Sequence, residues 1–311
     1  MASVLTFLTG AALLIYSAEK LITCLVGLAR GPAVSLFLLG LVFTGIEIDD
    51  LAFSVVLNVE DLEDVALGVV FGTVISMTGL ALAIAAIVAP SRVEVPRDYV
   101  VLFAAAPLVL VVPALLGELG FSFSIVLILL FVLFVVRVVH GESRRAVPPR
   151  SAEPPAAGLA RSGWVLLPSA VLASFAVVTG AWVMAKGTEG IQERFAIGGT
   201  VFGATAATLV LSLEDMFLTA EPARRGAPSL GIGNVIGSVV FSVTAKVGIV
   251  ALAGGALVIT PEVFTWHLPP LVVINGFAAY ALLTGHLRRW HGMVLLAGYV
   301  AYVTVGLATA A

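Results

Sequence analysis

The stretch FTGIEIDDLAFS, residues 43–54, sets three acids, Glu47, Asp49 and Asp50, in the middle of an apolar run. Acids are rare in this chain, because 60% of its 311 residues are hydrophobic and only 11% are Asp, Glu, Lys or Arg. Soluble domains carry about 25% charged residues, and so few charges could not cover their surface without large apolar patches. Together with a mean hydropathy of +1.13, this composition excludes a soluble enzyme and indicates a protein with several membrane-spanning helices.

Ten segments are long and apolar enough to span a bilayer as helices, which takes about 20 residues each. The predicted helices cover residues 3–28, 33–57, 65–89, 98–117, 121–140, 164–186, 195–220, 229–258, 263–284 and 290–309. Between the fifth and the sixth lies GESRRAVPPRSAEPPAAGLARSG, residues 141–163, whose Pro, Arg, Ser and Ala content predicts a flexible linker. The sequence thus predicts an all-α polytopic membrane protein, with five helices in residues 1–140 and five in residues 164–311.

Basic residues gather on one side of the predicted membrane. The loops after the odd-numbered helices hold or flank twelve arginines, whereas the opposite side has only Lys186 and Arg194. Because cytoplasmic loops carry the excess of Lys and Arg, we expect the linker to be cytoplasmic and both termini to lie outside the plasma (cytoplasmic) membrane. The net charge of −3 argues against a nucleic-acid partner, and the sequence gives no sign of an obligatory protein partner.

The two halves of the chain are similar in sequence. When Asp50 is aligned with Asp215, the pair Gly68/Gly72 falls on Gly233/Gly237 without a gap. Since each half has an odd number of predicted helices, the second must run inverted relative to the first. Inverted repeats are typical of secondary transporters, whose binding site lies near the midplane of the bilayer between the repeats.

The second half carries its own acids in TLVLSLEDMFLT, residues 208–219. Ionisable residues inside a membrane are costly and indicate a functional site by default. In each half, three oxygen-bearing residues spaced i, i+3 and i+7 are predicted to share one helix face: Glu47, Asp50 and Ser54 in the first, and Ser212, Asp215 and Thr219 in the second. Two such faces opposed across a pseudo-two-fold axis would form the oxygen-rich site that hard cations such as Ca²⁺ bind.

Other interpretations of these acids stay open at this point. Asp50 and Asp215 could instead cap broken half-helices. Asp49 and Glu214 point about 100° away from their neighbours, so each is a ligand, a cap or a group that faces water. Glu47 is a ligand or a proton carrier.

A Gly-x-x-x-Gly pair follows each acidic stretch at the same distance from its Asp, and a hydroxyl side chain, Thr73 or Ser238, comes next. Such glycine pairs permit close approach of two helix backbones. The combination of acid, glycine pair and hydroxyl at a fixed spacing is more specific than any of these features alone.

With these motifs the chain resembles the cation/Ca²⁺ exchanger superfamily, which includes the sodium/calcium exchangers. The two repeats of that family read close to G-T-S-x-P-E followed by G-N-x-x-G-S-N. The matching segments are GIEIDD (45–50) with GVVFGTV (68–74), and VLSLED (210–215) with GNVIGSV (233–239). The resemblance implies ten helices, a central core made of the second, third, seventh and eighth, and alternating access by sliding of the first and sixth.

The resemblance also implies a set of site residues. The family's two cation-binding glutamates fall on Asp50 and Asp215, and its motif serines fall on Glu47 and Ser212. The candidate cation-site residues are Asp50, Asp215, Glu47, Ser212, Thr73, Ser238, Ser242, Asp49 and Glu214, of which Asp50, Asp215 and Glu47 are the candidate metal ligands.

Several positions depart from the family pattern. Apolar Ile46, Leu211 and Met77 stand where the family has oxygen-bearing side chains, so the sequence does not fix sodium coupling or calcium selectivity. Lys246 is a further departure, one turn beyond Ser242 on the same helix face. It either snorkels to the outer interface or acts as a built-in, charge-compensating cation that pairs with the acids and replaces a coupling ion.

The function predicted from these residues is secondary cation antiport, most simply of Ca²⁺ against Na⁺ or H⁺, by alternating access at a midplane carboxylate site. The expected partners are inorganic cations and the lipid bilayer, and neither a cofactor nor catalysis is expected. The alternatives are a proton-coupled exchanger for another metal or a monovalent cation/proton antiporter. An intramembrane aspartyl protease also needs two membrane Asp residues, but its GxGD element is missing.

Overall fold

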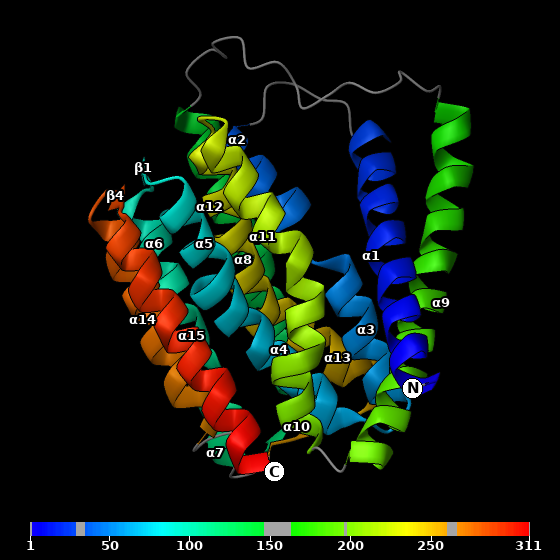
Figure 1. Cartoon of the computed structure of the whole chain (residues 1–311). Coiled ribbons are helices and arrows are strands. Elements are labelled where there is room, and N and C mark those ends of the chain that lie inside the picture. Colours follow the sequence, from blue (N-terminus) through cyan, green and yellow to red (C-terminus); the bar gives the residue numbers. More distant parts are fainter. Residues whose placement is uncertain (1, 29–34, 146–162, 196–197, 260–265, 311) are drawn as a thin grey trace.

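The computed structural model describes residues 2–28, 35–145, 163–195, 198–259 and 266–310, nearly all of them helical (Figure 1). The first half consists of α1 (Ala2–Leu28), α2 (Leu36–Leu39), η1 (Gly40–Thr44), α3 (Ile48–Val59), α4 (Glu63–Ser76), η2 (Met77–Ala81), α5 (Leu82–Val88), β1 (Ser91–Arg92), α6 (Arg97–Ala105), η3 (Ala106–Leu110), α7 (Val111–Leu116), β2 (Glu118–Leu119) and α8 (Phe121–Arg145). The second half consists of α9 (Gly163–Phe195), α10 (Gly199–Phe202), η4 (Gly203–Ala207), α11 (Thr208–Arg224), α12 (Pro228–Phe241), η5 (Ser242–Lys246), α13 (Val247–Gly254), β3 (Leu257–Val258), α14 (Leu268–Leu283), β4 (His286–Leu287) and α15 (Arg289–Ala310).

Eight helical segments of the described chain are long and apolar enough to cross a membrane. They coincide with eight of the ten predicted helices, which confirms an all-α polytopic membrane protein. The predicted helix 263–284 corresponds to the shorter apolar helix α14, and residues 260–265 lie outside the described part of the chain. Both termini lie at one end of the bundle, whereas α8 ends and α9 begins at the other, as an odd number of crossings in each half requires (Figure 1).

The second predicted helix, 33–57, is not continuous, and this prediction was wrong. The helix formed by α2 and η1 ends before Gly45, and α3 begins at Ile48, with Glu47 at a non-helical ψ of 87°. A side chain cannot be accommodated at position 45, because a Cβ there would lie 2.8 Å from the Cα of Gly237. The apolar residues Ile46 and Ile48 continue the hydrophobic run on either side of Glu47, and hydropathy alone did not locate this break.

Several helix ends differ from the prediction as well, and the largest difference is at α9, which continues to Phe195 instead of ending at residue 186. Helix α8 continues to Arg145, into the predicted linker, because the segment 141–145 contains no proline and Glu142 accepts a hydrogen bond from Ser35. Helix α13 ends at Gly254, where Gly255 adopts a φ of 109° that favours glycine, and residues 257–258 form β3 rather than helix. The rest of the predicted linker, residues 146–162, lies outside the described residues.

The core of the bundle is formed by the two spans that contain α4 and α12. In each, 89% of the membrane-spanning window is buried, compared with 28–50% in the other six spans. Each span contains a π-helical turn, η2 or η5, and the two turns begin at Met77 and Ser242, which are equivalent positions of the two repeats. Two further π-helical turns, η1 and η4, lie in the helices packed against this core. Such turns are rare and occur mainly at functional sites.

The predicted glycine contacts are confirmed, and they recur in both halves. A Cβ at Gly68 would overlap the carbonyl oxygen of Thr200, and one at Gly233 would overlap that of Phe37. Each glycine pair therefore packs on the backbone of the helix that precedes the acid of the opposite half. This exchange of contacts is what two inverted, interlocking repeats produce.

The same contacts show that the repeats differ in length just before their acids. When Asp50 is aligned with Asp215, Phe37 falls on Phe202, but its equivalent in the glycine contacts is Thr200, two positions earlier. The second half therefore has two extra residues in this interval, which add roughly 3 Å of helix. The first half covers the same distance through its break, since an extended residue rises about 1.8 Å more than a helical one.

Short strand pairs join the helix ends across the two halves. Strand β1 pairs antiparallel with β4, with Ser91 opposite Leu287, and β2 pairs with β3, with Glu118 opposite Val258. In both pairs, a strand from one half meets a strand from the other. The two halves are thereby tied together at their loops as well as through the glycine contacts.

Helices α1 and α9 form an antiparallel pair at one side of the bundle (Figure 1). Three glycines of α9 carry this contact, with Gly180, Gly187 and Gly190 lying against successively earlier residues of α1. The pair is fastened to the end of α3, where Glu60 accepts hydrogen bonds from Lys186 (2.7 Å) and Trp182 (3.0 Å).

The close packing at Gly237 leads to the first prediction. The substitution Gly237→Ala places a methyl group against the carbonyl oxygen of Leu41, and overpacking of this kind lowers the free energy of unfolding by about 1–3 kcal/mol. Gly276→Ala in α14 is the matched control, because no atom of the described residues outside its own stretch of helix lies within 4 Å of a Cβ placed there, and alanine is the better helix former. Thermal midpoints in detergent should fall for Gly237→Ala and stay level or rise for Gly276→Ala. Equal midpoints would contradict the glycine packing.

Candidate functional site

The break between η1 and α3 brings two acids into the core of the bundle. Glu47 lies in the non-helical link and Asp50 in the first turn of α3, and their exposed fractions are 5% and 3%. The N-terminus of a helix carries a partial positive charge that favours a carboxylate in its first turn. The third acid of this stretch, Asp49, is half-buried instead.

Glu47 is held by two serines of the opposite half. Its Oε1 accepts a hydrogen bond from Ser238 Oγ at 2.5 Å, and its Oε2 accepts one from Ser242 Oγ at 3.3 Å. The serines are one helical turn apart, so the core helix lies alongside both carboxylate oxygens. Both serines were predicted as site residues, and they meet the acid of the first half rather than Asp215.

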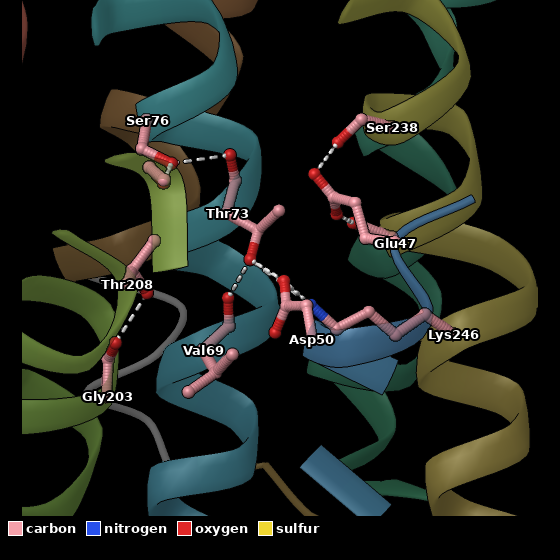
Figure 2. Close-up of polar contacts among 11 residues, drawn as sticks. Glu47, Asp50, Val69, Thr73, Ser76, Gly203, Thr208, Ser238 and Lys246 are labelled. Carbon is pink, nitrogen blue, oxygen red and sulfur yellow. Dashed lines mark hydrogen bonds and ion pairs between the residues drawn. The ribbon is translucent and has the colours of Figure 1, made fainter. Parts of the chain in front are cut away.

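Asp50 is paired with Lys246, as Figure 2 shows. The lysine Nζ lies 2.5 Å from Asp50 Oδ2 and 3.1 Å from Thr73 Oγ1. The Thr73 hydroxyl lies within hydrogen-bonding distance of Asp50 Oδ2 and of the Val69 carbonyl oxygen, and its single proton can go to one of them. Lys246 itself has an exposed fraction of 0%. Its side chain therefore turns inward and does not snorkel to the membrane interface.

The second half does not repeat this arrangement. Asp215 and Glu214 are half-buried, and neither makes an ion pair within the described part of the chain. Ser212 is buried and lies 2.7 Å from Ser76, hydroxyl to hydroxyl, and Thr219 accepts a hydrogen bond from Asn234 at 3.3 Å. Helix α11 is continuous through Glu214 and Asp215. The second half therefore has no helix break that would place an acid in the core, as the break at Glu47 does in the first half.

The acidic side chains are consequently dispersed in this structure. Among the described residues, no three His, Cys, Asp or Glu side chains are grouped closely enough to hold a metal ion together. Glu47 is engaged by serines and Asp50 by Lys246, whereas Asp215 makes no ion pair among the described residues but lies close enough to Glu47 and Asp50 to interact with them electrostatically. Three buried side-chain oxygens of this region have no hydrogen-bond partner among the described residues, namely Asp50 Oδ1, Ser54 Oγ and Asn234 Oδ1.

Ser76 is a site residue that sequence reasoning missed. It bonds to Ser212 and to the Thr73 carbonyl oxygen at 3.0 Å. The repeat alignment places it on Phe241, so the comparison of the halves carried no signal for it. Its position at i+3 from Thr73, on the same face of α4, was the signal that could have identified it.

Apolar side chains occupy the three positions where the family resemblance implies oxygen ligands. Met77 is fully buried, Leu211 is buried with an exposed fraction of 4%, and Ile46 is half-buried. At these three positions the site therefore lacks the oxygen ligands that the resemblance implies.

The chain matches the family described as sodium/calcium exchanger protein over residues 2–139 and 165–307. An uncharacterized membrane protein of Methanocaldococcus jannaschii is 24% identical over 300 residues, 94% of each chain. The sodium/calcium exchanger MaX1 of Methanosarcina acetivorans is 31% identical over 136 residues, which are 43% of this chain and 39% of that relative.

Among solved structures, the fold is similar to that of the sodium-calcium exchanger NCX_Mj soaked with 2.5 mM Na⁺ and 10 mM Sr²⁺. The TM-score is 0.68 at 20% identity, and the match covers 97% of this chain and 98% of the other. At this level of identity the likeness concerns the fold.

The ion pair between Asp50 and Lys246 leads to the second prediction. Removing one member of a buried pair leaves the other charge uncompensated, which costs about 3–5 kcal/mol. Asp50→Asn and Lys246→Met should each lower the thermal midpoint in detergent by far more than their combination does.

The control for this cycle is Glu221→Gln, which removes an exposed carboxylate paired with Arg225. Exposed pairs contribute little to stability, so its midpoint should match that of the unmodified protein. Additive losses in the double variant would show that Asp50 and Lys246 are not coupled.

Proposed function

The chain belongs to the sodium/calcium exchanger family, and from that premise we propose that it is a secondary antiporter that moves Ca²⁺ across the membrane in exchange for Na⁺ or H⁺. Family membership and the exchanger fold support cation exchange. The proposal of Ca²⁺ rests on the chemistry of the site, because Ca²⁺ prefers carboxylate, hydroxyl and carbonyl oxygens.

The observation that carries the proposal is the pair of buried carboxylates at a helix break. Glu47 and Asp50 lie in the core with hydroxyl groups of Thr73, Ser238 and Ser242 beside them. Carboxylates in the interior of a membrane protein are retained where ions pass or bind, and interrupted helices form the binding sites of many secondary transporters. We propose that these five residues are ligands of the transported cation.

The acids of the second half, Asp215 and Glu214, do not contact the Glu47–Asp50 site directly in this structure. Asp215, Glu214 and Ser212 lie on the same continuous helix, and Ser212 already reaches α4 through Ser76. We propose that a shift of this helix brings Asp215 to the cation together with Ser212, while Asp49 and Glu214 line the path. Such a movement would complete the carboxylate set that is dispersed in this structure.

Alternating access is assigned to α1 and α9. These helices contact each other extensively through glycines and are held to the core by the Glu60 hydrogen bonds. We propose that the pair slides past the core to open the site to one side and then to the other. Residues 1–140 and 164–311 would be the two inverted repeats, with the linker 141–163 cytoplasmic and both termini outside.

Uptake of radioactive Ca²⁺ into proteoliposomes tests this function. The unmodified protein should exchange Ca²⁺ when a Na⁺ or pH gradient is imposed, and Asp50→Asn with Asp215→Asn should abolish exchange. Glu221→Gln, which removes an exposed carboxylate of the same helix as Asp215, is the control and should retain exchange. Undiminished exchange in the double variant would contradict the site assignment.

A second candidate is favoured by the oxygen ligands that are absent. With Met77, Leu211 and Ile46 at three implied ligand positions, fewer oxygens remain for a coupling Na⁺. The alternatives are a proton-coupled exchanger for another metal and a monovalent cation/proton antiporter.

The driving gradient separates these candidates. If coupling is to protons, a pH gradient without Na⁺ should drive exchange, and replacing Na⁺ by choline should not slow it. Parallel assays with Mn²⁺ and with Na⁺ as the only transported cation identify the cargo. Strict dependence on Na⁺ would exclude proton coupling.

A further inference from the structure

Lys246 is a charged residue in one of the two most buried spans of the described chain. It ends the π-helical turn η5, and its side chain is fully buried. Its Nζ bonds to the carboxylate of Asp50 and the hydroxyl of Thr73. Burial of an unpaired ammonium group in an apolar interior is strongly unfavourable. The lysine therefore depends on Asp50 for its place in this core.

The lysine belongs to one half of the molecule alone. The matching turn η2 ends at Ala81, the residue that aligns with Lys246, so the repeat scaffold forms this π-helical turn without a charge. The ion pair also joins the halves, since Asp50 comes from the first and Lys246 from the second. A residue that the scaffold does not require, placed on the carboxylate proposed to bind the cargo, points to a role in the transport cycle.

We propose that Lys246 is a tethered counter-cation, an inference that rests on the proposed cation site. Its ammonium group occupies the cation position on Asp50 Oδ2 when cargo is absent, and it leaves that oxygen when the transported cation binds. Lys246 thereby provides one positive charge at the site. Without the lysine, the site would bind a monovalent ion from solution in its place.

The geometry at Asp50 fits such an exchange of partners. Asp50 Oδ2 accepts the ammonium group at 2.5 Å, whereas Oδ1 has no hydrogen-bond partner among the described residues. Oδ1 can therefore accept a cation before the lysine leaves Oδ2, once a path to this buried oxygen opens. The Thr73 hydroxyl lies 3.1 Å from Nζ and within hydrogen-bonding distance of Asp50 Oδ2. Its oxygen can therefore contact either the ammonium group or the transported cation.

A purely structural ion pair predicts a different response to Na⁺. If the pair only fastens α3 to η5, then replacing Lys246 lowers stability and creates no affinity for free cations. If the lysine stands in for a cation, its removal leaves a site at Asp50 that Na⁺ can fill.

The experiment measures the thermal midpoint of the purified full-length chain in detergent, in NaCl and in choline chloride at equal ionic strength. Lys246→Met should gain a Na⁺-dependent rise of about 3 °C over the response of the unmodified protein, the size expected for ligand at roughly tenfold above its dissociation constant. Lys246→Arg keeps the charge and should respond as the unmodified protein does. Combining Lys246→Met with Asp50→Asn should remove the gain.

The proposal is overturned if Lys246→Met responds to Na⁺ no more than the unmodified protein, or if the gain persists after Asp50→Asn. Should Lys246→Met fail to survive extraction in choline, recovery in NaCl alone supports the proposal. Loss in both salts, with the double variant still folded, overturns it. This readout needs no transport, so absent Ca²⁺ exchange with an intact Na⁺ gain would refute the proposed function and leave the counter-cation assignment standing.

Discussion

The ion pair between Asp50 and Lys246 is the interaction on which the centre of this molecule depends. A charge buried in an apolar interior costs several kcal/mol unless it is paired and hydrogen-bonded. The break at Gly45–Glu47 places Asp50 and Glu47 in the core. The opposite half supplies their partners, the ammonium group of Lys246 for Asp50 and two serine hydroxyls for Glu47. Glu47 and Lys246 each have partners in the opposite half, while Asp50 also lies within hydrogen-bonding distance of Thr73 of its own half. The two halves are therefore held together at the proposed cation site, where the transported cation would compete for the same oxygens.

Backbone packing sets the frame in which that pair forms. The glycine pairs bring each core helix against the backbone of the other half, and the contacts are equivalent on the two sides. The equivalence ends before the acids, where the second half has two more residues and stays helical. This difference makes the site one-sided, with Glu47 and Asp50 buried and Asp215 half-buried. A near-symmetric scaffold thus carries an asymmetric set of charges.

Much of the fold could be predicted from the sequence, because it follows from hydropathy, from glycines at a fixed spacing and from acids in apolar runs. Gly68 and Gly233 fit only a close backbone contact, and acids in an apolar run indicate a site. The break at Gly45 escaped prediction, because Ile46 and Ile48 continue the hydrophobic run and Glu47 between them was assigned to one face of a continuous helix. Ser76 escaped because the repeat has no counterpart for it. The sequence could not decide whether the Lys246 side chain extends to the membrane interface or to Asp50. The answer depends on the distance between the two halves of the chain, which a local sequence pattern does not give.

The most direct test of Lys246 as a tethered counter-cation is the coupling ratio, which is the number of monovalent cations exchanged per Ca²⁺. The reversal potential in proteoliposomes gives this ratio. A tethered counter-cation supplies one positive charge in each cycle. Lys246→Met should therefore raise the ratio by one relative to the unmodified protein, whereas Lys246→Arg should leave it unchanged. An identical ratio in an active Lys246→Met variant would contradict the claim that the lysine replaces a coupling ion.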